Sequence, residues 1–474
     1  MDRQFDVIIV GSGPAGIFCA YELMELSPNK RVLLVEKGVS LRKRQCPILK
    51  GRIQQCPTNP KGYAGCYPHC SITSGFGGAG AFSDGKFNIT SEFGGWMSDY
   101  LTDATVQSLI EHVDSIMLNH GAPQSITDPQ TPFIRTIEKE AISHGLKLLR
   151  ARVRHLGTEN NLDIQQAICD TLAKHVSMRF STEVDDIVVE NDTIKGITLS
   201  NGEVINAEHV VLAPGRDGAS WLDDLCATHG IVQTNNTVDI GVRVETSNAV
   251  METINEHLYE GKFVYQSSLG TRVRTFCSNP SGHVVIENHS GTMLANGHAY
   301  HDAAMGSDNT NFALLVSHDF DSPFREPNKF AHSVSKLANM LSDGSIIVQS
   351  YGDLTRGRRS TDKRIKESFI TPTLKEARPG DLSLALPYNT LASIREMIEK
   401  LNMVTPGVAS PHTLLYGVEA KFYSARPKMN DHFESPIHNL YFAGDGAGLT
   451  RGLAQSSASG VHVARAIIDK EGNQ

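Results

Sequence analysis

The chain contains a glycine pattern with the spacing of a dinucleotide-binding loop. Gly11, Gly13 and Gly16 form G-x-G-x-x-G directly after the apolar run 7–10 and before a helical segment. In such a loop the first glycine permits a tight turn, the second lets the backbone approach a pyrophosphate, and the third lets the helix pack close to the strand. The pyrophosphate then binds at the helix N-terminus, where unpaired N–H groups and the helix dipole favour an anion. A tight turn without a ligand is the alternative. The loop residues expected to bind a cofactor are Gly11, Gly13, Pro14, Ala15 and Gly16.

A carboxylate and two basic residues follow the next expected strand. Segment 30–38, KRVLLVEKG, reads as that strand and reaches Glu36, 20 residues after Gly16. The Glu36 carboxylate is placed to accept hydrogen bonds from the ribose hydroxyls of an adenosine. Because an acid would repel a 2′-phosphate, this site disfavours NADP. Lys37 and Arg44 complete the cofactor-binding residues expected here.

The C-terminal region carries a second motif that separates FAD from NAD. Segment 440–443 reads as a strand, followed by Gly444-Asp445-Gly446 and a helix start rich in small residues. This motif resembles the C-terminal fingerprint of FAD-dependent oxidoreductases. The resemblance implies that Asp445 binds the ribityl chain and that the next helix directs its N-terminus at the flavin N1/O2 edge. A helix N-terminus stabilises the negative charge that reduced flavin gathers there. The cofactor-binding residues expected from this motif are Gly444, Asp445, Gly448, Thr450 and Gly452.

A third segment lies between these two. Residues 184–218 read as strand, turn, strand, turn and strand, ending at Ala213-Pro214-Gly215. They resemble the β-meander and turn that return towards the FAD adenosine in the same families. The resemblance implies that the backbone of Val184 contacts adenine and that Ala213 and Gly215 lie at the cofactor. An amphipathic helix over 161–176 precedes this segment as a crossover.

The stretch SGFGGAGAFSDGKFN, residues 74–88, gathers five glycines outside both motifs. In glutathione-reductase-like flavoproteins a glycine-rich loop after the second strand lies along the pyrophosphate, the ribityl chain and the ring. The alternative is a mobile linker, but linkers are usually polar and this stretch carries three phenylalanines. We expect Gly77, Gly78, Gly80 and Ser83 to contact the cofactor, with Lys86 in reach of flavin or substrate.

Further segments occur in one order along nearly the whole chain. They include GFGGAGAFSDGKFN, RVRHLGTE, DIGVRVE, RVRTFC, NGHAY, LLYGVEAKFYS and GDGAGLTRGL. They resemble a widespread bacterial family of NAD(P)/FAD-dependent oxidoreductases, also described as FAD-utilising dehydrogenases, whose name specifies no substrate. The resemblance implies FAD as cofactor and an α/β fold. That fold is a Rossmann-like FAD-binding domain of the glutathione-reductase type with an inserted α+β substrate or cap domain.

The expected FAD-binding domain is discontinuous. Its parts are residues 1–90, 150–235 and 405–474, with a helical or cap segment at 91–149 and a substrate or cap domain at 236–404.

Within the expected substrate domain, three segments read as strands of one mixed sheet, and two segments read as helices on it. The strands are 238–246, 282–288 and 345–352, and the helices are 328–341 and 390–401.

Candidate catalytic residues come from segments that could line a pocket over the flavin. They are Arg243, Arg274, Cys277, His298, Lys421, Tyr423 and Arg451. A hydride step to or from carbon also needs a proton partner, and His298, Tyr423 or Lys421 could serve if burial tunes its pKa. The structural alternative is that the arginines pair with nearby acids and that Cys277 belongs to the core.

The expected function is FAD-dependent hydride transfer between flavin N5 and a small organic substrate. A flavin monooxygenase is one alternative, although its usual G-D-A-A-H motif is replaced by GDGAGLTRGLAQ. A non-catalytic protein that uses FAD for structure or sensing is the other. Apart from Gly75 to Gly80 inside the second glycine-rich stretch, no further G-x-G-x-x-G appears, so NAD(P)H would be an external electron donor without a domain of its own.

Composition excludes several classes of protein. The net charge of −8 argues against a nucleic-acid or anionic-membrane binder, and no apolar run approaches the roughly 18 residues of a membrane span. The N-terminal residues MDRQFDVIIV lack a leader pattern, so we expect a cytoplasmic enzyme. Cys46, Cys56, Cys66 and Cys70 fit neither zinc nor ferredoxin spacing, so we expect reduced thiols and no metal.

Overall fold

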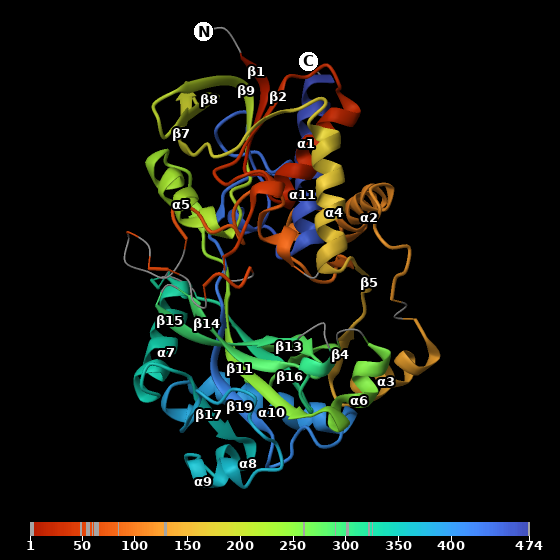
Figure 1. The fold of residues 1–474 in the computed structure, drawn as a ribbon, viewed down its shortest axis with the longest axis vertical. Helices are drawn as coiled ribbons and strands as arrows, with labels where there is room; N and C mark the ends of the chain where they lie inside the picture. Colours follow the sequence, from red (N-terminus) through yellow and green to blue (C-terminus); the bar gives the residue numbers. More distant parts are fainter. Residues whose placement is uncertain are drawn as a thin grey trace. The chain divides into compact units, whose positions relative to one another are not determined.

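The structure of the chain is a computed structural model that divides into two compact units (Figure 1). Unit 1 comprises residues 1–127, 151–236 and 424–474, and unit 2 comprises residues 128–150 and 237–423. The structure describes residues 4–47, 50–53, 57–58, 60, 66–83, 85–127, 130–258, 261–289, 291–299, 303–320, 323–324 and 326–472.

Unit 1 is built on a seven-stranded sheet in the order β6-β2-β1-β9-β8-β7, with β21 also paired to β9. The strands β1, β2, β6, β9 and β21 pair in parallel, and β7, β8 and β9 form an antiparallel meander. This arrangement confirms the predicted Rossmann-like sheet with a β-meander. The strands are β1 (Phe5–Val10), β2 (Val32–Val35), β6 (Ser177–Arg179), β7 (Val184–Glu190), β8 (Thr193–Leu199), β9 (Val204–Leu212) and β21 (Leu440–Phe442).

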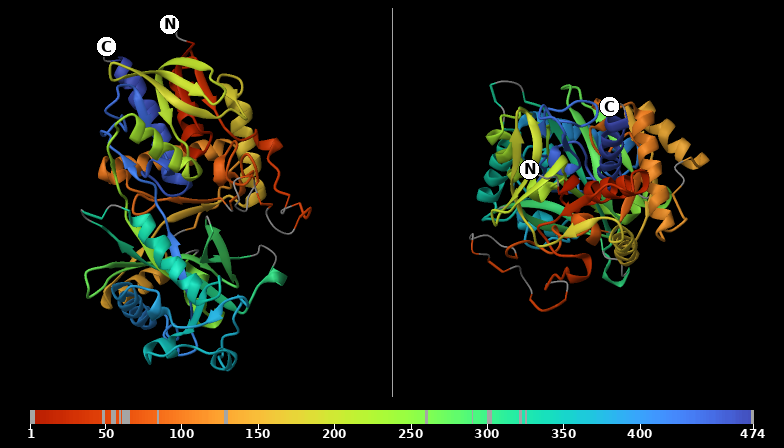
Figure 2. Two further views of the ribbon diagram at one scale, coloured as in Figure 1. Left: turned by 90° about the vertical axis from the view of Figure 1, so that its left-hand side faces the viewer. Right: turned by 90° about the horizontal axis from the view of Figure 1, so that it is seen from above.

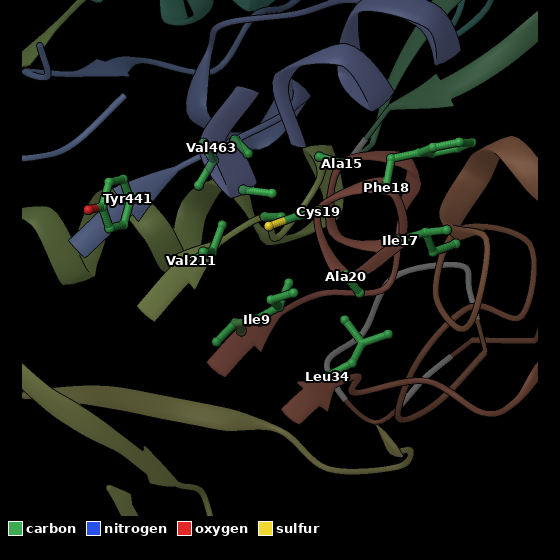
Figure 3. Close-up of a cluster of buried hydrophobic side chains, with 14 of the residues drawn as sticks. Ile9, Ala15, Ile17, Phe18, Cys19, Ala20, Leu34, Val211, Tyr441 and Val463 are labelled. Atoms are coloured by element: carbon green, nitrogen blue, oxygen red, sulfur yellow. The ribbon is translucent and has the colours of Figure 1, made fainter. Parts of the chain in front are cut away.

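Two helices pack closely beside the parallel strands of this sheet. They are α1 (Pro14–Leu26) and α11 (Leu453–Gly472), and their buried side chains join those of the strands in one apolar cluster (Figures 2 and 3). Ile9 is fully buried because helices cover the strand, as expected for a continuous apolar run in a parallel sheet. A Cβ at Gly460 would lie 2.0 Å from the Ala15 carbonyl oxygen, so only glycine allows this approach of the two helices.

Shorter elements complete unit 1. The helices are α2 (Asp103–Asn119), α4 (Thr158–Leu172) and α5 (Ala219–Thr228), with 3₁₀ turns η1 (Leu41–Lys43), η2 (Gly78–Phe82), η3 (Met97–Asp99), η4 (Arg216–Gly218) and η7 (Asp445–Ala447). The two small strand pairs are β3 (Lys86–Ile89) with β5 (Arg152–His155), and β10 (Gln233–Thr234) with β20 (Arg426–Pro427).

Unit 2 is built on an eight-stranded sheet in the order β18-β17-β19-β11-β16-β13-β12-β4. All neighbours pair antiparallel except β17 and β18. The strands are β4 (Leu146–Leu149), β11 (Val238–Ser247), β12 (Lys262–Gln266), β13 (Arg272–Asn279), β16 (Asn309–His318), β17 (Ile347–Ser350), β18 (Arg378–Pro379) and β19 (Leu414–Lys421).

A separate hairpin and several helices accompany this sheet. The hairpin consists of β14 (His283–His289) and β15 (Thr292–His298). The helices are α3 (Pro132–Ser143), α6 (Asn248–His257), α7 (Pro327–Leu341), α8 (Tyr351–Thr355), α9 (Asp362–Lys366) and α10 (Tyr388–Val404), with 3₁₀ turns η5 (Ala303–Met305) and η6 (Leu382–Leu384).

Strand β11 separates an apolar face of the unit 2 sheet from a charged one. Ile240, Val242 and Val244 belong to the apolar cluster of the unit. The alternate residues Asp239 and Arg243 are also buried, although they carry charge. The period of two along a strand thus places the charged side chains together on the opposite face.

The structure differs from the sequence expectations in two respects. Segment 405–423 was expected in the FAD-binding domain, but β19 pairs with β11 and β17 in unit 2. Residues 282–288 were expected in the main sheet, but β14 pairs with β15 in the hairpin. Both outcomes depend on pairing between distant segments, which local patterns do not specify.

The expected segment 91–149 is also divided. Residues 91–127 lie in unit 1, where α2 contributes to the apolar cluster, and α3 and β4 lie in unit 2. None of the helices in the described part of the chain is long and apolar enough to cross a membrane.

Candidate active site

The first glycine loop has the geometry that phosphate binding requires. Gly11 has φ +101°, and a Cβ there would lie 2.2 Å from the Ala213 carbonyl oxygen. A Cβ at Gly16 would lie 1.9 Å from the Gly11 carbonyl oxygen, so the first turn of α1 packs directly on the loop. Gly13 is the N-cap of α1 and makes no side-chain cap, and a Cβ there would meet nothing within 4 Å. The N-terminus of α1 is therefore open to an anion.

The carboxylate of Glu36 joins this loop to the second glycine-rich loop. Ser12 donates its backbone N–H and hydroxyl to Oε2 at 2.9 and 2.8 Å, and Gly38 and Gly75 donate backbone N–H groups to Oε1 at 2.8 and 3.0 Å. A carboxylate accepts about four hydrogen bonds, and these four donors from the protein already fill that number. Glu36 therefore positions the two glycine loops, and its contact with a ribose stays a prediction.

The second loop packs on the first. Gly77 has φ +86° and donates its N–H to the Ser12 carbonyl oxygen at 2.8 Å. A Cβ at Gly78 would lie 3.0 Å from the Gly13 Cα, and a Cβ at Gly80 would lie 2.4 Å from a methyl carbon of Leu453. Residues 77–80 thus bring bare backbone against the nucleotide loop and the first residue of α11.

Arg44 holds this second loop through backbone carbonyls. Its guanidinium donates to the carbonyl oxygens of Ser71, Ile72, Phe76 and Gly78 at 2.7 to 2.9 Å. Arg44 is 5% exposed, and burial lowers the pKa of its guanidinium to about 10, so it remains charged at neutral pH. Four of its five N–H groups shape the loop, and contact with the cofactor itself stays a prediction.

Helix α4 contributes two polar residues that the sequence analysis did not single out. Asn161 is fully buried and donates to the Gly80 and Ala81 carbonyl oxygens at 2.8 and 3.2 Å. Its own carbonyl oxygen and that of Gln165 have no hydrogen-bond partner among the described residues. Their spacing in the sequence could have indicated them, because residues 161 and 165 fall on the buried helix face with Ile164 and Ile168.

The turn around Asp445 is closed by short contacts. Asp445 accepts hydrogen bonds from the Thr450 hydroxyl at 2.7 Å and the Gly452 N–H at 3.4 Å. Burial raises the pKa of Asp445, and the nearby Arg216 guanidinium opposes this rise. A Cβ at Gly446 would lie 2.4 Å from the Gly215 carbonyl oxygen, so the two predicted turns meet.

The remaining predicted cofactor residues lie at the margins of this region. Lys37 forms an ion pair with Asp217 at 2.6 Å. Burial alone would raise the pKa of Asp217, but the Lys37 ammonium lowers it below its ordinary value. Ser83 donates its hydroxyl to the Gly80 carbonyl oxygen at 2.7 Å. Val184 is the buried first residue of β7. Gly448 has φ +67°, and a Cβ there would lie 2.6 Å from the Asn236 amide nitrogen.

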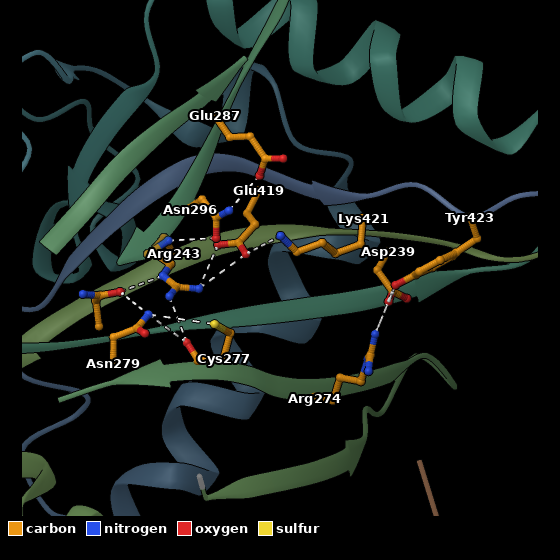
Figure 4. A network of polar contacts seen from close by, with 12 residues as sticks. Asp239, Arg243, Arg274, Cys277, Asn279, Glu287, Asn296, Glu419, Lys421 and Tyr423 are labelled. Atoms are coloured by element: carbon orange, nitrogen blue, oxygen red, sulfur yellow. Dashed lines mark hydrogen bonds and ion pairs between the residues drawn. The ribbon is translucent and has the colours of Figure 1, made fainter. Parts of the chain in front are cut away.

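In unit 2, the structure brings three predicted catalytic residues, Arg243, Cys277 and Lys421, into one network (Figure 4). The Arg243 guanidinium is fully buried and donates to Asn311 Oδ1 at 2.9 Å, to Glu419 at 3.4 Å and to the Cys277 carbonyl oxygen at 2.8 Å. The Lys421 ammonium lies 3.3 Å from the same Glu419 carboxylate. The Arg243 donors are used inside the sheet, as the structural alternative expects, and its role at a pocket stays a prediction.

Arg274 and Tyr423 form a second group around Asp239 (Figure 4). Both donate to the Asp239 carboxylate, Arg274 also donates to the Tyr423 hydroxyl at 3.2 Å, and Ser317 donates to Asp239 at 2.7 Å. Burial alone would lower the pKa of Arg274, but Asp239 and Tyr423 raise it. This group couples a phenol, a guanidinium and a carboxylate, which is suited to holding and passing a proton.

His298 and Cys277 stand apart from that proton-bearing group. His298 is the exposed last residue of β15. Cys277 is partly buried, and its backbone has φ +48°. Among the described residues, Cys46, Cys66 and Cys70 belong to no cluster of potential metal ligands, and Cys56 lies outside the described residues.

Family models match three parts of the chain. A model described as FAD binding domain matches residues 6–45, one described as glucose inhibited division protein A matches 153–256, and one described as FAD-dependent protein, C-terminal domain-like, matches 237–422. The first match covers the nucleotide loop and Glu36, and the last coincides with nearly all of unit 2.

The chain therefore carries an FAD-binding domain, and its residues 237–422 are similar to the C-terminal domain of FAD-dependent proteins.

The individual proteins that the chain resembles are distant in sequence. An uncharacterised protein of Clostridium beijerinckii is 26% identical over 489 residues, covering 98% of this chain and 80% of its own. Formate oxidase of Aspergillus oryzae, in a variant form, matches with 13% identity and a TM-score of 0.46, covering all of both chains. L-proline dehydrogenase of P. horikoshii matches with 12% identity and a TM-score of 0.39, covering 99% of this chain and 95% of its own.

The residues of unit 1 fit FAD. The α1 N-terminus at Gly13 is uncapped and sterically open, as a pyrophosphate requires. Gly215 and Gly452 are equally open, because a Cβ at either would meet nothing within 4 Å. The buried side-chain oxygens of Asn161 and Gln165 on α4, beside the second glycine loop, have no donor among the residues that the structure describes, and FAD offers ribityl hydroxyls as donors.

Proposed function

We propose that this chain is an FAD-dependent oxidoreductase that transfers a hydride between flavin N5 and a small organic substrate. When bound, FAD supplies the two-electron chemistry, and the protein supplies binding, orientation and a proton. The observation that carries the proposal is the group of Tyr423, Arg274 and Asp239 on the charged face of the unit 2 sheet. It provides a proton-bearing hydroxyl whose hydrogen-bond partners fix its position.

The roles of the chain's own residues follow from their contacts. Unit 1 binds the cofactor between its two glycine loops, with Glu36 and Arg44 holding those loops in place. Tyr423 holds the proton that accompanies a hydride step to or from carbon, and Arg274 and Asp239 orient it. Lys421 and His298 are the other candidates for that proton.

The experiment separates hydride transfer from the alternatives. The holoprotein is photoreduced without oxygen and then mixed with a panel of organic acceptors, among them enones, imines and quinones. We expect at least one acceptor to reoxidise the flavin stoichiometrically under these conditions. Reoxidation that needs oxygen and yields a hydroxylated product would establish a monooxygenase instead, and a flavin that reacts with nothing would indicate a structural or sensing role.

Variants test the proton assignment once a reacting substrate is found. Tyr423→Phe removes the hydroxyl and should slow the flavin reaction by about 10²-fold, the lower end of general acid–base contributions. Lys421→Met and His298→Asn are the comparisons. If all three variants retain FAD and react within about threefold of wild type, a range far below such contributions, the proton comes from elsewhere.

A further inference from the structure

Three side chains of a kind that bind metals converge in unit 1, away from both glycine loops. Glu208 and His209 are adjacent in β9, and Glu471 lies in the last turn of α11. One potential ligand atom of each residue lies within 4.8 Å of those of the other two. An imidazole nitrogen and two carboxylate oxygens form a donor set that zinc accepts in proteins. The group therefore has the composition of a three-ligand zinc site.

His209 gives an independent sign that this group binds a ligand. It is 2% exposed. Its Nε2 lies 3.2 Å from Glu471 Oε1, but neither ring nitrogen makes a hydrogen bond with any residue that the structure describes. Buried polar groups are normally hydrogen-bonded, because burial without a partner destabilises the folded chain. A cation between these two atoms would accept a lone pair from each and remove that destabilisation.

The spacing of the ligand atoms suits a tetrahedral zinc ion. Two ligands at about 2.0–2.1 Å from such an ion lie about 3.3 Å apart. The distance between His209 Nε2 and Glu471 Oε1 is 3.2 Å. Glu208 and Glu471 are only partly buried, so rotation about their side-chain bonds can bring the third ligand atom to the same separation. The side chain of Glu471 is 33% exposed, which gives an ion a path from solvent.

The charges around the group favour a cation. The Lys30 ammonium pairs with Glu471 Oε2, which leaves Oε1 on the side of His209. The neighbouring Lys470 pairs with Glu434 at 2.6 Å, so its charge is already balanced. Two carboxylates in the group thus face one ammonium. The C-terminal end of a helix also carries the negative end of the helix dipole, and Glu471 lies at that end of α11.

We propose that Glu208, His209 and Glu471 bind one zinc ion, which joins strand β9 to the C-terminal end of α11. A zinc ion with three protein ligands keeps a water molecule in its fourth position. Magnesium and calcium prefer oxygen ligands alone, so they fit this set less well. None of the three ligands is a cysteine, so the site is separate from the cysteine region in which we expect no metal.

The role of the ion is structural, and it does not depend on the proposed hydride transfer. Strand β9 belongs to the parallel part of the unit 1 sheet, and α11 begins shortly after the turn around Asp445. An ion that binds only the folded chain stabilises it in proportion to the logarithm of its concentration. Zinc should therefore hold the far end of α11 on the sheet and raise the Tm.

The experiment titrates zinc calorimetrically into FAD-loaded protein that has first been dialysed against a chelator. We expect saturable binding of about one zinc ion per chain and a higher Tm, with a smaller effect of magnesium or calcium at the same concentration. X-ray absorption at the zinc edge should show nitrogen and oxygen ligands at about 2.0–2.1 Å. Glu208→Gln and Glu471→Gln should each weaken zinc binding at least about tenfold, because changes even to outer partners of metal ligands weaken it about 10- to 100-fold.

The control is Glu203→Gln, because Glu203 directly precedes β9, forms an ion pair with Arg179 at 2.7 Å and lies outside the group. It should leave zinc affinity unchanged. Absence of saturable zinc binding, an equal loss of affinity in the control, or unchanged affinity in both Glu208→Gln and Glu471→Gln would overturn the proposal. Greater stabilisation by magnesium than by zinc would overturn it too. A shell of sulfur atoms at about 2.3 Å would place the ion at cysteines and have the same consequence.

Discussion

Glu36 and Gly75 are 39 residues apart in the sequence, and the Glu36 carboxylate accepts a hydrogen bond from the Gly75 backbone nitrogen at 3.0 Å. The same carboxylate accepts two hydrogen bonds from Ser12. One buried acid therefore fixes the nucleotide loop and the second glycine loop in a common position. Its removal should disturb both loops at once.

Glu36→Gln replaces an acceptor oxygen with a donor nitrogen opposite backbone N–H groups. We expect a loss of about 1.5–3 kcal/mol in the free energy of unfolding, the usual range for a hydrogen bond to a charged group. FAD affinity should fall as well, because the loops that carry Gly13 and Gly78 lose their common anchor. Urea unfolding of the apoprotein and fluorescence titration with FAD measure the two effects.

Glu190→Gln is the matched control for this change, because Glu190 is an exposed residue at the end of β7. It should alter neither quantity. A Glu36→Gln variant that loses FAD affinity at unchanged apoprotein stability would show that Glu36 acts on the ribose alone.

Asp445→Asn should raise the stability of the apoprotein and lower its affinity for FAD. Burial raises the pKa of Asp445 above its ordinary value of 3.8, so the folded apoprotein binds this proton more tightly than the unfolded chain. Ionisation of Asp445 then costs stability as the pH rises above about 4, and the cost grows until the pH has passed the folded-state pKa. The variant should be more stable than wild type at pH 7.5, with a smaller difference at pH 4.5.

The same variant should bind FAD roughly 10- to 100-fold more weakly, because it loses a charged hydrogen-bond acceptor. Urea unfolding of the apoprotein at the two pH values and FAD titration provide the measurements. Equal destabilisation at both pH values would contradict the account of Asp445.

Arg243→Met tests the structural role of the buried ion pair with Glu419. Breaking a buried pair by removing one partner costs about 3–5 kcal/mol, because the other charge remains buried without its partner. Arg243→Met combined with Glu419→Gln should therefore cost less than the sum of the two single changes. Urea unfolding measures this double-mutant cycle, and strict additivity would show that the two side chains do not interact.

Local patterns in the sequence predicted the parts of the site that depend on nearby residues. The spacing of Gly11, Gly13 and Gly16 after an apolar strand predicted the open N-terminus of α1, and the structure confirms that element. Asn161 and Gln165 were missed because an amphipathic pattern was read only for its apolar residues, although two polar residues shared the buried face.

The other parts of the fold and site depend on which distant strands pair, and local sequence patterns do not show this pairing. Nothing in the sequence near Arg243 shows that Glu419, 176 residues later, lies beside it. The same limit explains segment 405–423, where β19 joins unit 2 through its pairing with β11. Charged residues in a strand indicate that a partner exists, but the partner is known only once the register of the sheet is known.

The identity of the bound flavin tests the central claim most directly. The purified protein is denatured by heat, and the released flavin is identified by mass and counted per chain. We expect non-covalent FAD at about one per chain, and none in Gly13→Val, whose side chain would fill the approach to the α1 N-terminus. Release of FMN, or the absence of any flavin after reconstitution of a folded protein with FAD, would contradict the claim.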